Sequence, residues 1–284
     1  GHRTLAVSPA SDVTEHTGEG VVGTVDGRRV HVGRPEALGA DHLDWHGSLD
    51  QYHEDKLSLT HGEGHHLTVI PDDPELLTRR DQLGGDLVIC DDKDVELATD
   101  LGRIGDHNAR NVALALRVVS LALRCEVTEV RVAAQRESLS FQPLPGRLTV
   151  VHRSGRIDFI DDGLATTPLA TAAALSSLAD QTVMAVVGGF DRGVEYQTLF
   201  DAVENHGDVT LITIGPAGQR IATEAPQSIR VISATGVRDA VHTAHEELSG
   251  RTGVVLLSPA APSFDEFSNW AERSAAFTDA ARHF

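Results

Sequence analysis

The amino-acid sequence predicts an α/β protein whose C-terminal half is a Rossmann-like, doubly wound parallel sheet. From about residue 144 onward, strand-like segments alternate with helical segments of roughly ten residues or more, which is the pattern of βαβ units. The segment 183–187 is apolar at every position, as expected for a central parallel strand that is covered on both faces.

The elements of this half follow in order. A hairpin is predicted from residues 147–151 and 156–160, around Ser154-Gly155. Strands are then predicted at 182–187, 210–214, 230–232 and 253–257, and helices at 168–178, 195–205, 217–224, 235–248 and 265–282. Because such sheets bind ligands at the carboxyl ends of their strands, three segments become candidates for a site: Gly188–Gly193, Ile214–Pro216 and Ser258–Ala260.

The N-terminal half is less regular. Residues 1–37 are predicted to be β-rich, because two strand-like runs flank the turn dipeptide Asp26-Gly27. Within 38–143 we expect a polar helix at about 48–60, short strands at 67–70 and 87–90, and a helix at about 108–124. In that last helix one apolar stripe is formed by Val112, Leu116, Val119 and Leu123.

Composition excludes several classes of function. The chain has 284 residues, about two domains in length, and its net charge of −18 argues against broad binding to nucleic acids or anionic membranes. No apolar run reaches the ~18–20 residues of a membrane span, and no signal peptide is recognised. Cys90 and Cys125 lack the spacing of a metal site or a disulfide framework, so we expect a cytoplasmic protein.

Two strand-end segments carry candidate chemistry. Gly188–Gly193 places Asp191 and Arg192 after a buried strand, where arginine suits a carboxylate or phosphate; the alternative is a turn with a surface ion pair. Residues 161–168 end one strand and open a helix, with Thr167 suited to its N-cap and Pro168 to its first turn. This helix start could bind an anion, or could be ordinary capping.

Two further clusters lie in the N-terminal half. Residues 41–46 hold two carboxylates and two imidazoles, and Lys56 follows on the polar helix; this density is compatible with a metal or phosphate site. His107, Asn108 and Asn111 lie in the first turns of the helix predicted at 108–124. They could hydrogen-bond a heterocycle or simply cap the helix.

Taken together, these segments resemble the Mur ligases, most closely the glutamate-adding MurD branch. The resemblance runs from Asp41 to the C-terminus. It rests on Asp41–Ser48 with Tyr52 and Lys56, Gly105–Asn108 with Asn111, Leu144–Arg147, Asp162–Thr167, Gly188–Gly193 and Leu257–Phe267. The motifs Gly-Gly-Phe-Asp-Arg-Gly and Leu-Ala-Thr-Thr-Pro are similar to those of the variant MurD branch that adds L-glutamate.

The resemblance implies an ATP-dependent amide ligase of peptidoglycan precursor synthesis, which adds glutamate to UDP-N-acetylmuramoyl-L-alanine (UDP-MurNAc-L-Ala). Residues 38–143 would be part of its central ATP-binding domain, and 144–284 its glutamate-binding domain. A substrate carboxylate would be activated as an acyl phosphate and then attacked by the amine of glutamate. The implied cofactors are ATP and Mg²⁺, the partners are these small molecules, and the protein is expected to be a monomer.

Site residues are implied by the same resemblance. His42 and a carbamylated Lys56 would hold Mg²⁺, and Arg192 would take part in catalysis. The nucleotide would be contacted by His107, Asn108, Asn111, Arg147 and Asp162, and the glutamate by Thr166, Arg192, Ser263, Phe264 and Trp270. Gly163-Leu164 stands where MurD proper usually has Ser-Lys, which departs from the expected glutamate contacts.

The front of the chain departs further. Residues 9–35 resemble a piece of the nucleotide-binding domain of heavy-metal P-type ATPases, and an ordinary surface hairpin is an equally good interpretation. The chain begins with Gly1 and contains no GxxxxGK[ST] phosphate loop, which indicates a fragment or a processed start. We therefore expect no turnover by this chain alone; the alternative function is a non-catalytic module that binds a nucleotide or glutamate.

Overall fold

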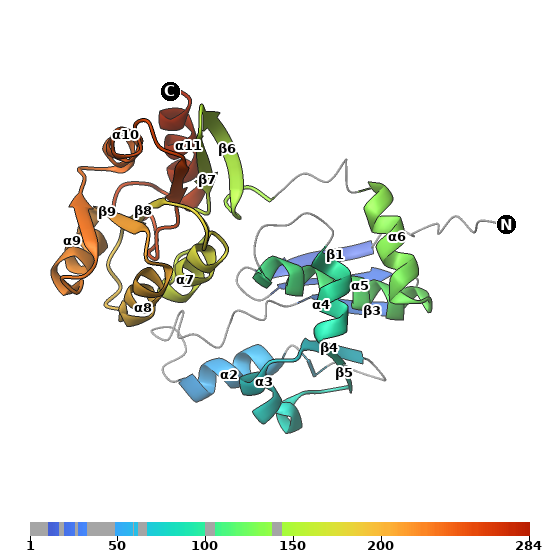
Figure 1. Ribbon diagram of the computed structural model, residues 1–284. Helices are drawn as coiled ribbons and strands as arrows, with labels where there is room; N and C mark the ends of the chain where they lie inside the picture. The colour runs from blue at the N-terminus through green and yellow to red at the C-terminus, as the bar shows by residue number, and fades with distance from the viewer. Residues whose placement is uncertain are drawn as a thin grey trace. The chain divides into compact units, whose positions relative to one another are not determined.

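The chain forms two compact units, residues 1–141 and 142–284, in the computed structural model shown in Figure 1. The structure describes residues 11–16, 20–25, 28–32, 49–58, 60–61, 67–99, 106–137 and 144–284. In the described part of the chain no helix is long and apolar enough to cross a membrane.

The C-terminal unit is built on a six-stranded sheet with the order β10-β9-β8-β11-β7-β6. Its strands are β6 (Thr149–Ser154), β7 (Ile157–Asp161), β8 (Val183–Gly188), β9 (Val209–Ile214), β10 (Arg230–Ser233) and β11 (Gly253–Leu257). All neighbours pair in parallel except β6, which runs antiparallel to β7 at the edge. The predicted α/β class is therefore confirmed, with the hairpin strand making the sheet mixed.

Helices cover both faces of this sheet (Figure 1). They are α7 (Pro168–Ser176), α8 (Gln197–His206), α9 (Gly215–Glu224), α10 (Val237–Glu247) and α11 (Trp270–Ala281). On one face, Phe159, Met184 and Val186 pack into a core with α10 and α11. Every residue of β8 is buried, which confirms the prediction for 183–187.

The last helix starts later than predicted, at Trp270 rather than near residue 265. Asn269 is its N-cap, and its side-chain oxygen accepts a hydrogen bond of 3.0 Å from the amide of Glu272. The Glu272 carboxylate in turn accepts one of 3.0 Å from the amide of Ser268. These two hydrogen bonds fix the helix start, and the preceding residues form a turn in which Phe267 donates to the Ser263 carbonyl.

The N-terminal unit holds two small sheets. Strands β1 (Ser11–His16), β2 (Gly20–Val25) and β3 (Arg28–Val32) form an antiparallel sheet, and β4 (Leu67–Pro71) pairs in parallel with β5 (Asp86–Cys90). Val25 pairs with Arg28, which confirms the hairpin predicted around residues 26–27, although these two lie outside the described residues.

Helices complete this unit: α2 (Leu49–Ser58), α3 (Pro74–Thr78), α4 (Asp92–Thr99), α5 (Asp106–Leu123) and α6 (Val127–Glu137). The sequence did not predict α3, α4 and α6; α3 and α4 are too short for a clear helical period. In α5, Leu116 is buried, and Val112 and Val119 pack against the same cluster as Val127 and Val130 of α6. Three of the four residues of the predicted stripe, all but Leu123, therefore pack in the cluster shared with α6.

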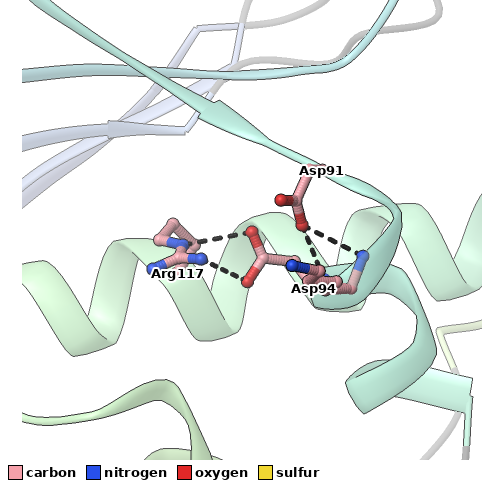
Figure 2. A network of polar contacts seen from close by, with 4 residues as sticks. Asp91, Asp94 and Arg117 are labelled. Carbon is pink, nitrogen blue, oxygen red and sulfur yellow. Dashed lines mark hydrogen bonds and ion pairs between the residues drawn. The ribbon is translucent and has the colours of Figure 1, made fainter.

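An ion pair between the buried carboxylate of Asp94 and the half-buried guanidinium of Arg117 ties α4 to α5 (Figure 2). The Arg117 guanidinium donates from Nη2 to Asp94 Oδ1 at 2.5 Å and from Nε to Asp94 Oδ2 at 3.2 Å. Asp91 Oδ1 accepts the amides of Lys93 and Asp94 and so caps α4. Burial, with the nearby Asp94 charge, raises the pKa of the Cys90 thiol to about 11, so this thiol stays protonated and unreactive near neutral pH.

Candidate functional site

The loops that follow β7, β8 and β11 are joined by backbone hydrogen bonds at the carboxyl edge of the sheet. Asp162 donates its amide to the Leu257 carbonyl at 2.8 Å, and Ala260 donates to Ala165 at 2.9 Å. Phe190 donates to Pro262 at 2.9 Å. Segments from different parts of the sequence therefore form one connected layer where ligands of such sheets bind.

Close approach of these loops requires glycine at two positions. Gly188 and Gly189 have φ angles of 116° and 137°, a region that residues with a Cβ rarely adopt. A Cβ on Gly188 would lie 2.0 Å from the Ile214 carbonyl oxygen, and one on Gly189 would lie 2.3 Å from that of Pro262. These glycines thus serve loop packing.

Asp162 is nearly buried, with 6% of its surface exposed. Its Oδ2 accepts a hydrogen bond of 2.9 Å from Ser258 Oγ, and its Oδ1 accepts one of 3.3 Å from the Leu148 amide. Burial raises the pKa of the Asp162 carboxyl to about 7, although these hydrogen bonds and the nearby Arg147 charge act in the opposite direction. A buried carboxyl that titrates near neutral pH is typical of functional sites.

The adjacent Asp161 is held by α11. Its Oδ1 accepts hydrogen bonds of 2.9 Å from the Gly163 amide and from Ser274 Oγ. Burial raises the pKa of Asp161 as well, against the lowering effect of these bonds. A Cβ on Gly163 would lie 2.2 Å from Ser274 Oγ. The glycine that departs from the expected Ser-Lys pair is therefore matched to a serine on another element.

Arg192 and Thr166, both predicted glutamate contacts, are brought together. Arg192 Nη2 donates a hydrogen bond of 3.0 Å to the Thr166 carbonyl, which joins the loop after β8 to the loop after β7. Both residues are half-buried. A guanidinium held at a strand end can pair with a carboxylate.

Asp191 has a structural role. Its Oδ1 accepts a hydrogen bond of 2.9 Å from the Gly193 amide and lies 3.4 Å from Arg220 Nη1. The Arg220 guanidinium in turn stacks 4.7 Å from the centre of the Tyr196 ring. Asp191 thus shapes the glycine-rich loop, which agrees with the alternative interpretation of Gly188–Gly193 as a turn that contains an ion pair.

Thr167 caps α7, since its Oγ1 accepts a hydrogen bond of 3.3 Å from the Ala170 amide, and Pro168 follows in the first turn. This confirms the predicted capping.

The other predicted glutamate contacts differ in exposure. Ser263 is buried, whereas the Phe264 side chain is 68% exposed. Trp270 is half-buried, and its ring lies so close to Gly146 that a Cβ there would be 2.8 Å from Cζ3. Trp270 therefore packs on the backbone directly before Arg147, a half-buried residue predicted to contact the nucleotide.

The structure says less about the predicted site residues of the N-terminal unit. His42 lies outside the described residues, and Lys56 is half-buried on α2. His107 and Asn108 lie in the first turn of α5, and Asn111 is exposed one turn later. Among the residues that the structure describes, no group of three or more His, Cys, Asp or Glu side chains is arranged to hold a metal ion.

Sequence reasoning missed Thr171, Arg273 and Ser274 at this edge, and it named Ser258 only as part of the candidate segment Ser258–Ala260. The Thr171 hydroxyl lies 3.1 Å from Ser258 Oγ, next to Asp162. A signal for Arg273 was available, because it stands four residues before Phe277 and seven before Ala280. It therefore occupies the buried stripe of α11, where a charged side chain needs a reason.

Comparison with known proteins identifies the C-terminal unit. Residues 146–261 match the family model described as "Mur ligase, glutamate ligase domain". The chain is 33% identical over 264 residues to a UDP-N-acetylmuramoyl-L-alanine--L-glutamate ligase of Xanthomonas oryzae, with 86% of this chain and 55% of that protein covered. It is 36% identical to a UDP-N-acetylmuramoylalanine--D-glutamate ligase of Deinococcus radiodurans, with 91% and 58% covered.

Solved structures agree on the fold. MurF ligase from Thermotoga maritima in complex with ADP aligns with a TM-score of 0.60 at 15% identity, covering 87% of this chain and 61% of that one. A folylpolyglutamate synthase of Mycobacterium tuberculosis, complexed with ADP and AMPPCP, aligns with a TM-score of 0.58 at 17% identity, covering 86% and 61%. The chain spans a little over half the length of its curated relatives, and the match to the glutamate ligase domain of Mur ligases lies within its C-terminal unit, at residues 146–261.

Proposed function

We propose that this chain is the glutamate-adding part of a UDP-MurNAc-L-Ala–glutamate ligase and that its C-terminal unit binds the incoming glutamate. The observation that carries the proposal is the Arg192–Thr166 hydrogen bond at the carboxyl edge of the sheet. It holds a guanidinium where a glutamate carboxylate would be oriented for attack by its amine. The names of the curated relatives, which cover both glutamate enantiomers, support the same substrate.

Glutamate recognition would combine this cation with neighbouring apolar and polar groups. The exposed Phe264 and the half-buried Trp270 offer apolar surface at the same edge. Ser263 is buried within the loop after β11, so we propose that it acts mainly by holding the loop beside Phe264. Leu164 replaces the lysine of MurD proper, which leaves Arg192 as the proposed anion clamp.

A nucleotide would lie next to this site. Arg147 supplies a cation beside the carboxyl of Asp162, and we propose that this pair contacts the ribose and phosphates of ATP. For the N-terminal unit by itself, we propose His107, Asn108 and Asn111 as contacts for an adenine ring. The two solved relatives described above are named as nucleotide complexes, which supports nucleotide binding in the family.

Mg²⁺ does not fit the described residues alone. Lys56 is a cation and would become a ligand only as a carbamate, and the described residues hold no ligand cluster. We therefore assign no step to the metal. We further propose that the protein is cytoplasmic and that the chain is a monomer. Size-exclusion chromatography of the purified chain tests the oligomeric state.

Titration calorimetry with L-glutamate and D-glutamate tests the proposed site. We expect wild-type chain to bind one enantiomer and Arg192→Ala to bind it at least tenfold more weakly, as for loss of a charge-assisted hydrogen bond of about 1.5–3 kcal/mol. Arg238→Ala is the matched control, since Arg238 is exposed on α10. Equal binding by wild type and Arg192→Ala would refute the clamp.

Turnover is a separate question. Because the chain has no GxxxxGK[ST] phosphate loop, and one preorganised donor is worth about 3 kcal/mol, we expect no phosphate release from ATP with UDP-MurNAc-L-Ala and either glutamate enantiomer. Clear turnover by the purified chain would show that the sequence present is sufficient for catalysis.

A further inference from the structure

One buried arginine of α11 reaches all three loops of the carboxyl edge. Arg273 Nη1 donates to the Ala261 carbonyl at 3.0 Å and lies 3.5 Å from that of Gly188. Its Nη2 donates to the Gly163 carbonyl at 3.2 Å. These carbonyls belong to the loop after β11, the end of β8 and the loop after β7. A single side chain thus links segments that are up to 110 residues from it in the sequence.

The surroundings of this guanidinium are unusual for a structural arginine. Arg273 is 1% exposed. The hydrogen bonds from its terminal nitrogens go to backbone carbonyls, while Nε has no hydrogen-bond partner among the described residues. Burial lowers its pKa to about 10, so the group stays charged at neutral pH. Burying a charge is costly, and the nearby charges of Asp265 and Asp161 offset part of that cost.

We infer that Arg273 is a positioning residue that fixes the three loops of the proposed glutamate site relative to one another. The inference rests on the proposed function. Each segment that Arg273 holds carries a proposed glutamate contact a few residues further on. Thr166 lies three residues after Gly163, Arg192 four after Gly188, and Phe264 three after Ala261. The side chain acts through these loops, because it is too buried to touch a ligand itself.

The planar fork of arginine suits this task. Its two terminal nitrogens donate in fixed directions, and here they serve carbonyls on different loops. Lysine would keep the charge but would concentrate its donors on one nitrogen. The neighbouring Ser274 adds to the same anchor, since its hydroxyl donates to Asp161 at 2.9 Å.

Amide hydrogen exchange on the ligand-free full chain tests the inference independently of glutamate. In Arg273→Met we expect exchange to rise about tenfold or more in the segments 162–167, 188–193 and 258–265 together, as for loss of about 1.4 kcal/mol of local stability. The helix α10, which receives no hydrogen bond from Arg273, should keep its protection. Arg273→Lys should have a smaller effect, and Arg220→Met, which removes contacts to Asp191 and Val194, should loosen only 188–193.

A second measurement separates positioning from general stability. For the enantiomer that wild type binds, we expect a Kd at least tenfold higher in Arg273→Met, with partial recovery in Arg273→Lys, at a temperature where both variants are fully folded by circular dichroism. Unchanged exchange in the three segments, or a uniform rise across the whole unit, would overturn the inference. If wild type binds neither enantiomer, the proposed function fails, and the exchange result still decides the role of Arg273.

Discussion

The buried ionisable side chains of the two units have different kinds of hydrogen-bond partner. In the N-terminal unit, Asp94 receives two hydrogen bonds from one guanidinium, that of Arg117 (Figure 2). In the C-terminal unit, the buried Asp161 and Asp162 accept hydrogen bonds from hydroxyls and amides, and Arg273 donates to carbonyls. Asp94 is thus hydrogen-bonded by an opposite charge, whereas the hydrogen bonds to the C-terminal groups come from neutral dipoles, with opposite charges nearby: Arg147 for Asp162, and Asp265 and Asp161 for Arg273.

The difference indicates different roles. A bidentate pair between two helices neutralises itself and serves as a structural tie. Asp162 and Arg273, which are hydrogen-bonded mainly by neutral groups of the loops, have shifted pKa values. Groups with shifted pKa values concentrate at functional sites. The family match falls on the C-terminal unit, in agreement with this division.

Removing one partner of the paired charges should have the largest effect. We expect Arg117→Met to lower the free energy of unfolding of the N-terminal unit by about 3 kcal/mol, because Asp94, 2% exposed, loses its counterion. Urea unfolding at pH 7 measures this. The double variant Arg117→Met with Asp94→Asn should recover part of the loss, and a loss under about 0.5 kcal/mol would show that the pair is no tie.

A steric exchange tests the anchor in the other unit. Gly163→Ala should destabilise the C-terminal unit by about 2 kcal/mol, as for an overpacked core, because its Cβ would lie 2.2 Å from Ser274 Oγ. In a Ser274→Ala background the nearest atoms are Asp161 Oδ1, at 3.0 Å, and Cβ of residue 274, at 3.5 Å, so part of the cost should disappear. Thermal unfolding of the four proteins gives the coupling, and purely additive effects would argue against the contact.

The C-terminal sheet could be predicted from the sequence because its strands and helices keep clear periods. The segments at its carboxyl edge were also identifiable from their glycines and polar residues. The contacts that organise this edge were not, because Arg273 and Ser274 reach Gly163 and Asp161 across more than 100 residues. No local pattern specifies such pairs. Only the apolar positions four and seven residues after Arg273 in α11 hinted at its burial.

In the N-terminal unit the hairpin around residues 26–27 and the stripe of α5 were predictable from local rules. Asp94, by contrast, was not identified. It lies in the short helix α4, which the sequence did not predict, and its partner Arg117 is 23 residues away on the polar edge of the α5 stripe. A carboxylate in a polar segment looks solvated until its distant partner is known.

The pH dependence of stability should sharpen the contrast between the carboxylates. Because the folded-state pKa of Asp162 is raised to about 7 from 3.8, the folded state holds a proton that the unfolded chain has lost between these values. Stability of the C-terminal unit should therefore fall as pH rises from about 4 to 7, by at most about 1.4 kcal/mol per pH unit from this group.

Asp162→Asn removes this titration while keeping the side-chain shape. Its unfolding free energy should vary less with pH across that window than that of wild type, and Asp161 should supply the residual slope, since its pKa is raised too. Urea unfolding at several pH values between 4 and 8 measures the difference. Parallel curves for wild type and Asp162→Asn would contradict the raised pKa of Asp162.

The smallest effect is expected for an ion pair on the surface of the C-terminal unit. Arg153 and Asp158 face each other across the β6–β7 hairpin, with Nε 3.1 Å from Oδ1. Their side chains are 70% and 39% exposed, so water and salt screen them, and Arg153→Met should change the unfolding free energy by under about 0.5 kcal/mol. The change should shrink further in 1 M salt, roughly a 3 Å screening length. A loss comparable to that of Arg117→Met would mean that burial is not what separates structural from incidental pairs in this chain.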